Sequence, residues 1–221
     1  NPKFEEGKQA NFAISEYLYV PIGADGYRDE RMENWFSPDE NALAILSRET
    51  TSKSFGKRLT PDQKGNAIRA SLILGYRSRY EFEKIAALVS PNEHPANIQR
   101  KVVSHFWAIY ERKLKQFLNW SFTIFYGLPE KLLICDRPLL DLTVHHNPEA
   151  MVLMPISPDA FLMGVPVATS RNPTLSWVDG STSDLATFIN HQAVMRAREF
   201  LVGDPFQFAA IANEMQFGEI K

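Results

Sequence analysis

The sequence predicts an α+β fold, in which an N-terminal helical layer is followed by an antiparallel β-meander covered by a C-terminal helix. Proline-marked helix starts occur in the first half, alternating apolar residues begin after Trp120, and small residues recur at helical spacing near the end. The chain shows no repeat and no linker. We therefore expect a single globular domain over residues 1–221, with the helical part at about 33–118 and the sheet with its covering helix at about 121–202.

The first helix is predicted from the stretch "SPDE". Ser37 can act as the N-cap, Pro38 suits the first helical position, and Glu40 completes a capping box. The cap hydroxyl satisfies an otherwise unpaired backbone amide, so this pattern places the helix start at Ser37. The helix is expected to run to about Arg48.

Two further helices are expected before the strands. The stretch "TPDQ" repeats the capping chemistry with Thr60 and Gln63, and the apolar spacing carries this helix past Gly75 towards Leu88. Another helix should have Pro95 at its first position and continue through a long stripe of apolar residues. Together these helices form the predicted N-terminal layer.

After the helices the apolar residues alternate, as they do in half-buried strands. The predicted strands are "SFTIFY", "KLLIC", "LLDLTVH", "AMVLM" and "AFLMGVPV". The turn "GLPE" is expected to join the first two strands as a hairpin, and "HNPE" is expected to turn between the third and fourth. The stretch "SRNPTLSWVDGS" is rich in turn residues and is expected to be a loop.

The last helix is predicted to start at Ser181 and Asp184. It carries a stripe of small or aliphatic residues, namely Ala186, Ile189, Ala193 and Ala197. Small side chains let a helix lie close to a sheet, so this helix should cover an apolar face of the sheet. Asn190 lies at the edge of the stripe, where a half-buried amide must find hydrogen-bond partners.

The composition indicates a soluble globular protein. The chain is 44% hydrophobic and 23% charged, with no apolar run long enough for a membrane helix and no signal-peptide pattern. The single cysteine, Cys135, excludes an internal disulfide framework and a multi-thiolate zinc site. We therefore expect a cytoplasmic protein. The motifs of P-loop, dinucleotide-binding, zinc-protease and serine-hydrolase enzymes are absent from the sequence.

The charge is unevenly distributed along the chain. Residues 40–115 carry 14 basic and 7 acidic side chains, whereas the regions on either side are acidic. One explanation is intramolecular complementarity between a basic helical layer and an acidic sheet layer. The other is nucleic-acid binding, through side chains that include Lys53, Lys57, Arg58, Arg100 and Lys101. We favour complementarity because the acidic regions would repel a polyanion.

The corner "CDRPLL" is the main candidate site. Asp136 follows an apolar strand, and Pro138 favours an extended conformation for the residue before it. An aspartate there can cap backbone amides, bind a cation or act as a base. We expect a groove for a small ligand or a protein partner near Asp136, Arg137, Ser157 and Asn190.

The double histidine that follows is not a metal motif in itself. His145 and His146 are adjacent on a predicted strand, so their side chains should point to opposite faces. Asp141 and His145 share a face but should lie about 13 Å apart at the usual strand rise. We therefore predict no metal site, and the histidines are expected to flank a turn.

Several stretches resemble one family. They are "ENWFSPDENALAIL", "LILGYRSRYEF", "LLICDRPLL", "MPISPDAFLMG" and "INHQAVMRAREFLVG". Together they resemble the uncharacterised bacterial family called domain of unknown function 4238, over most of residues 33–202. Residues 135–138 match a Ser-Asp-x-Pro-like corner of that family, with cysteine in place of serine. The family's usual initial His-His-x-x-Pro-like segment is not found here. The resemblance implies a relative in fold and no established activity.

Three functions remain open on the sequence. The favoured one is a domain that binds a small ligand or a partner protein near Asp136. The first alternative is a metal-dependent hydrolase or nuclease in which Asp136 holds a divalent ion. The second is nucleic-acid binding through the basic helical layer. The sequence identifies neither a cofactor nor an oligomeric state, and it predicts no membrane partner.

Overall fold

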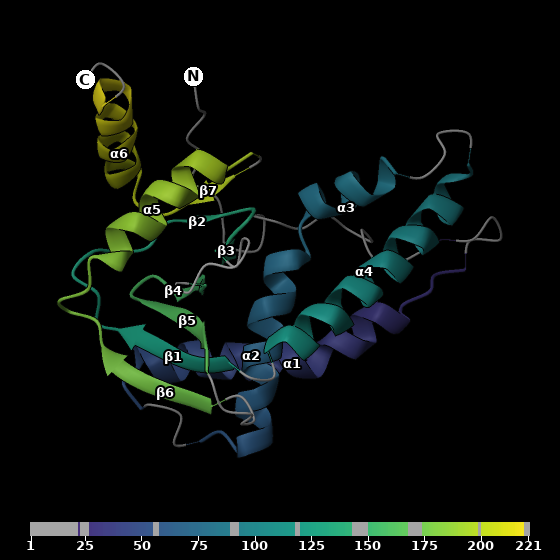
Figure 1. Cartoon of the computed structure of the whole chain (residues 1–221), viewed down its shortest axis with the longest axis horizontal. Coiled ribbons are helices and arrows are strands. Elements are labelled where there is room, and N and C mark those ends of the chain that lie inside the picture. Colours follow the sequence, from purple (N-terminus) through teal and green to yellow (C-terminus); the bar gives the residue numbers. More distant parts are fainter. Residues whose placement is uncertain are drawn as a thin grey trace.

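The computed structural model describes residues 22, 27–54, 58–88, 93–117, 120–142, 150–167, 174–198 and 200–218. Within these residues, six helices and a mixed sheet of five strands confirm the α+β class (Figure 1). The helices are α1 (Arg31–Thr51), α2 (Pro61–Tyr76), α3 (Arg79–Ala86), α4 (Pro95–Phe117), α5 (Leu185–Arg196) and α6 (Pro205–Gly218). The start of α4 at Pro95 is as predicted.

Helix α1 begins well before Ser37, so the predicted start at that residue is wrong. Pro38 lies inside the helix, and Ser37 is an interior residue. The reason is that the helical turn before Ser37 packs against α4. The ring centroids of Trp35 and Trp107 on α4 are 4.4 Å apart, and Phe36 is buried in the same aromatic cluster. Burial of these rings outweighs the cost of an interior proline, about 3 kcal/mol.

Helix α2 has the predicted capping box but ends earlier than expected. The Gln63 amide donates to the Thr60 hydroxyl over 3.2 Å, and the Thr60 amide donates to the Gln63 side chain over 2.9 Å. The helix ends at Tyr76 instead of continuing to Leu88, because Ser78 caps a separate helix, α3. The break leaves two polar residues at a junction between helices.

The main sheet contains one parallel pair that was not predicted. The strands are β1 (Trp120–Tyr126), β2 (Ile134–Cys135), β3 (Leu140–Asp141), β4 (Val152–Ser157), β5 (Ala160–Pro166), β6 (Thr174–Asp179) and β7 (Leu201–Val202). The sheet order is β3-β4-β5-β1-β6, with β6 parallel to β1 and the other pairs antiparallel. The expected loop at "TLSWVD" is therefore a strand, because it hydrogen-bonds along the second edge of β1.

The predicted hairpin between β1 and β2 is also wrong. β5 and β6 occupy the two edges of β1, and β2 pairs with β7 in a separate two-stranded sheet. The backbone amide of Leu132, just before β2, donates to the Pro158 carbonyl oxygen over 2.7 Å. The chain after β1 therefore runs along the turn between β4 and β5 instead of folding back on β1.

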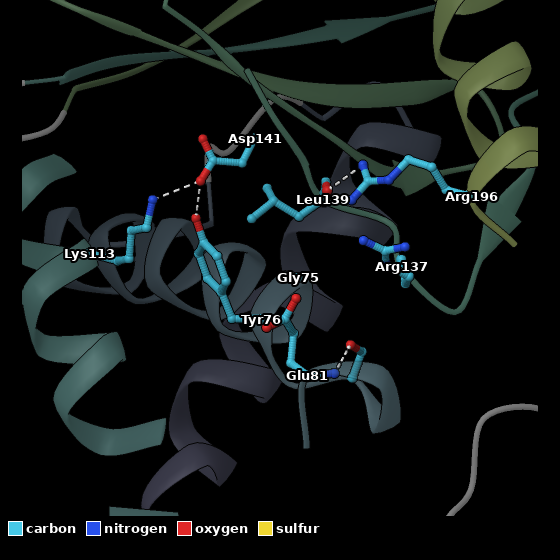
Figure 2. Close-up of a pocket in the computed structure, with 9 residues that line it drawn as sticks. Gly75, Tyr76, Glu81, Lys113, Arg137, Leu139, Asp141 and Arg196 are labelled. Atoms are coloured by element: carbon cyan, nitrogen blue, oxygen red, sulfur yellow. Dashed lines mark hydrogen bonds and ion pairs between the residues drawn. The ribbon is translucent and has the colours of Figure 1, made fainter. Parts of the chain in front are cut away.

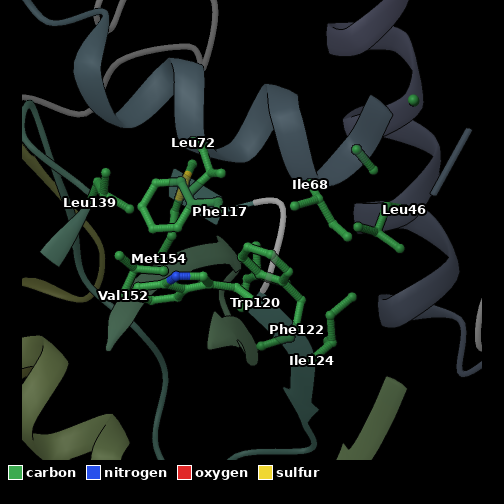
Figure 3. Close-up of a cluster of buried hydrophobic side chains, with 14 of the residues drawn as sticks. Leu46, Ile68, Leu72, Phe117, Trp120, Phe122, Ile124, Leu139, Val152 and Met154 are labelled. Atoms are coloured by element: carbon green, nitrogen blue, oxygen red, sulfur yellow. The ribbon is translucent and has the colours of Figure 1, made fainter. Parts of the chain in front are cut away.

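Alternate residues of the central strands face two hydrophobic layers. Phe122, Ile124 and Leu162 pack with α1 and α2 on one face (Figure 3). On the other face, Phe161 packs with Ile189 of α5. Helix α5 thus covers the sheet as predicted, opposite the N-terminal helical layer.

Helix α6 extends the fold beyond the predicted covering helix. Its Ile211 packs against Leu133, Cys135 and Ala193, next to α5 and β2. In Figure 1 it lies beyond α5, away from the main sheet. Among the described helices, none is both long and apolar enough to cross a membrane.

Candidate functional site

A pocket of about 320 Å³ opens where the helical layer meets the end of the sheet. We call it the Arg137 pocket (Figure 2). Its walls come from α2, α3, α4, α5 and the segment that leads into β3. They comprise Gly75, Tyr76, Ser78, Glu81, Lys113, Arg137, Leu139, Asp141 and Arg196. Segments that are far apart in sequence therefore bring charged and hydroxyl groups to one cavity.

The break between α2 and α3 shapes the base of the pocket. A Cβ atom on Gly75 would lie 2.2 Å from the Cβ atom of Leu139, so only glycine permits this close approach of α2 to the segment before β3. Immediately after the break, the Ser78 hydroxyl accepts a hydrogen bond of 3.2 Å from the Glu81 amide. This cap directs the first turn of α3 along the pocket.

Asp141 ties two helices to β3 at one side of the pocket. The Tyr76 hydroxyl donates to Asp141 Oδ2, and Lys113 Nζ lies 2.8 Å from the same oxygen. Burial, together with the hydrogen bond to Asp141, raises the pKa of Tyr76, so this hydroxyl remains a protonated donor. Lys113 neutralises the charge of Asp141, so the two side chains together add no net charge to this side of the pocket.

Two arginines form another side of the pocket. Arg196, at the end of α5, donates to the Leu139 carbonyl oxygen over 2.8 Å. The guanidinium carbon of Arg137 lies 4.0 Å from the centroid of the Tyr80 ring, and that of Arg198 lies 4.5 Å from it.

Across the part of the chain that the structure describes, neither Arg137 nor Arg196 forms an ion pair with a carboxylate. Burial lowers the pKa of Arg196, and the neighbouring Arg137 lowers it further. Arginine is nevertheless still charged at neutral pH. This side of the pocket therefore concentrates positive charge.

Of the four residues expected to share a groove, Arg137 lines this pocket. The Asp136 carboxylate instead accepts a hydrogen bond of 2.9 Å from the Arg198 backbone amide. Ser157 is buried at the end of β4, and its hydroxyl donates to Asp159 over 2.9 Å. Both side chains thus hold turns of the backbone, and a role for them in ligand binding stays a prediction.

Asn190 is fully buried on α5, not half-buried as expected. Its carbonyl oxygen accepts from the Leu133 amide over 2.7 Å, and its amide nitrogen lies 2.9 Å from the Lys131 carbonyl oxygen and 3.2 Å from Glu130. The side chain therefore fastens α5 to the segment before β2.

Sequence reasoning missed most of the pocket lining. Tyr76, Lys113 and Arg196 were not selected, because they belong to three separate helices and nothing local in the sequence brings them together. The available signal was Asp141, a charged residue within the apolar stretch "LLDL". His145 and His146 lie outside the described residues. Within the described ranges, no group of three or more His, Cys, Asp or Glu residues is placed to hold a metal ion.

Some basic side chains of the helical layer form ion pairs within the protein. Arg77 contacts Glu33 and lies 2.7 Å from Glu40, while Arg69 lies 2.9 Å from the buried Asp39. Lys101 of the proposed nucleic-acid surface contacts Glu93, and Lys57 lies outside the described residues. These pairs lie within the helical layer, whereas Lys113–Asp141 joins that layer to the sheet. Complementarity between a basic helical layer and an acidic sheet layer therefore stays a prediction.

No protein-family model, curated protein or solved structure matches this chain. The resemblance to domain of unknown function 4238 therefore stays a prediction. Among the described residues, the Arg137 pocket brings together charged side chains from α3, α4, α5 and β3.

Proposed function

We propose that this chain is a small-molecule-binding domain whose ligand occupies the Arg137 pocket. The observation that carries the proposal is a cavity of about 320 Å³ into which charged side chains converge from α3, α4, α5 and β3. Sites for small ligands start at about this size and place a few polar groups in a concave surface between elements of structure.

The contacts around the pocket hold its charged side chains in fixed positions. Lys113 and Tyr76 fix Asp141, and the Arg196 guanidinium is fixed by the Leu139 carbonyl oxygen. Side chains held in this way lose less rotational freedom when a ligand arrives, which favours affinity.

The two alternatives have less support. Asp136 as a metal ligand would have to coordinate while its carboxylate accepts the Arg198 amide. Of the basic side chains expected to bind nucleic acid, Lys101 already contacts Glu93. We therefore favour the pocket over both.

A panel of small anionic, cationic and neutral molecules tests this function. Glu81 faces the pocket, whereas Glu83 is an exposed residue of the same helix, so Glu81→Trp should block the cavity and Glu83→Trp should not. A ligand at about 100 times its Kd adds about 2.7 kcal/mol of stability. For a domain of this size that raises the melting temperature by about 5–10 °C. We expect this rise in the wild type and in Glu83→Trp but not in Glu81→Trp.

Backbone amide shifts provide a readout in the wild type that does not depend on how well the variants fold. A bound molecule should shift the amides of Ser78, Glu81 and Arg137. The proposal fails if no compound in the panel shifts these amides, or if a stabilising compound acts equally on Glu81→Trp.

A further inference from the structure

The positive side of the Arg137 pocket indicates the chemical class of its ligand. Arg137 and Arg196 come from different elements, face the same cavity and, among the described residues, have no carboxylate partner. Two half-buried like charges repel each other, and the repulsion is relieved when an anion binds between them. The other charges of the lining do not supply that anion.

Each of the acidic residues in the lining has a basic partner of its own. Lys113 lies 2.8 Å from Asp141, and Lys84 lies 3.6 Å from Glu81. The lining itself carries three positive and two negative side chains, and Lys84 lies outside it. With Glu81 and Asp141 paired to lysines, the charges of Arg137 and Arg196 are left without a carboxylate partner among the described residues. A cationic ligand would add to the repulsion, and a neutral ligand would leave it in place.

We propose that the ligand is a small phosphate monoester whose phosphate group is bound by Arg137 and Arg196. This inference rests on the proposed function. A phosphate monoester carries a charge of about −1.5 to −2 at neutral pH, whereas a carboxylate carries −1. The two arginine side chains also offer planar arrays of N–H donors, which match the three terminal oxygens of a phosphate.

The rest of the pocket suits the organic part of such a molecule. The side chains of Leu139 and Tyr76 provide apolar surface beside the arginines, and Leu139 packs closely on Gly75 at the base of the cavity. Tyr80 stacks on Arg137 and holds its guanidinium group in place without using up its N–H donors on a carboxylate.

Phenyl phosphate and benzoate form a matched pair of probes, because they share the ring and differ in the anionic group. Calorimetric titration of the full chain at constant ionic strength should show phenyl phosphate binding at least about tenfold more tightly than benzoate. Arg137→Gln and Arg196→Gln should each weaken the binding of phenyl phosphate at least about tenfold. Arg79→Gln, which removes an exposed arginine of α3 paired with Glu83, should not.

A purely structural role for the two arginines predicts a different result. Their replacement would then lower the melting temperature without changing the further rise that phenyl phosphate causes. Equal or tighter binding of benzoate, phosphate binding that survives Arg137→Gln and Arg196→Gln, or no phosphate binding at all would each overturn this inference. If a neutral compound binds in the pocket and phosphate does not, the proposed function stands and the phosphate inference falls. If no compound of any class binds, both fall.

Discussion

At the residue scale, Asn190 shows how one buried amide can join two parts of the chain. Asn190→Ala would leave the buried Leu133 amide without its acceptor and would remove a donor to Lys131. A buried polar group left unpaired costs about 1–3 kcal/mol. We expect the free energy of unfolding to fall by about 2–3 kcal/mol in urea denaturation.

Gln192→Ala is the matched control, because Gln192 lies on the same helix and its side chain contacts only the Met195 sulfur, over 3.9 Å, among the interactions seen. The free energy of unfolding of this variant should stay within about 0.5 kcal/mol of the wild-type value. A loss in Asn190→Ala no greater than in Gln192→Ala would show that the amide does not fasten α5 to the segment before β2.

Residue identity alone predicted the site only in part. Arg137, at the corner before Pro138, lines the pocket, and its role in binding stays a prediction. The sequence could not show that Asp136 would turn to the Arg198 amide, since that contact joins residues 62 positions apart. Arg196 was missed for the same reason, because its pocket partners lie in α2, α4 and the segment before β3.

At the element scale, two glycines of α2 should respond oppositely to the same substitution. Gly65→Ala places a methyl group where nothing lies within 4 Å, so it should stabilise the helix by about 0.5–1 kcal/mol. Gly75→Ala drives a methyl group to 2.2 Å from Leu139, and such overpacking should destabilise the protein by about 1–3 kcal/mol. Urea denaturation of both variants measures the two effects. Stabilisation by Gly75→Ala would contradict the close approach that forms the pocket base.

Elements with strong local signals were predicted well. The capping box at Thr60 and the start of α4 at Pro95 depend on residues within one turn, and both are present. The start of α1 was wrong because Trp35 and Phe36, outside the apparent cap, pack on α4. Local chemistry thus predicts an element's start where distant packing does not compete with it.

At the scale of the whole molecule, the change along the sequence from helical to alternating spacing of apolar residues predicted the α+β class. It did not predict the order of the strands in the sheet. β6 pairs with β1 across about 50 residues of chain, and β2 finds its partner in β7, more than 60 residues later. Strand pairing over such separations depends on which edges remain open after the other strands have paired, which a single sequence does not display.

Global stability should depend on Tyr110 at alkaline pH. Tyr110 is buried in the aromatic cluster between α1 and α4, and burial raises its pKa to about 12. The unfolded chain loses this proton near pH 10, while the folded protein retains it until about pH 12. The contribution of this pKa difference to the free energy of unfolding is therefore fully present below pH 10 and is lost as the pH rises towards 12.

Tyr110→Phe should remove this part of the alkaline loss. Among the described atoms, the Tyr110 hydroxyl is buried without a hydrogen-bond partner, so the variant should be at least as stable as the wild type at pH 8. Its advantage should then grow between pH 10 and pH 12. Tyr27→Phe is the control because Tyr27 is 68% exposed, and its stability should follow the wild type throughout. Urea denaturation across this pH range measures all three proteins, and parallel curves for wild type and Tyr110→Phe would refute the buried, protonated state of this hydroxyl.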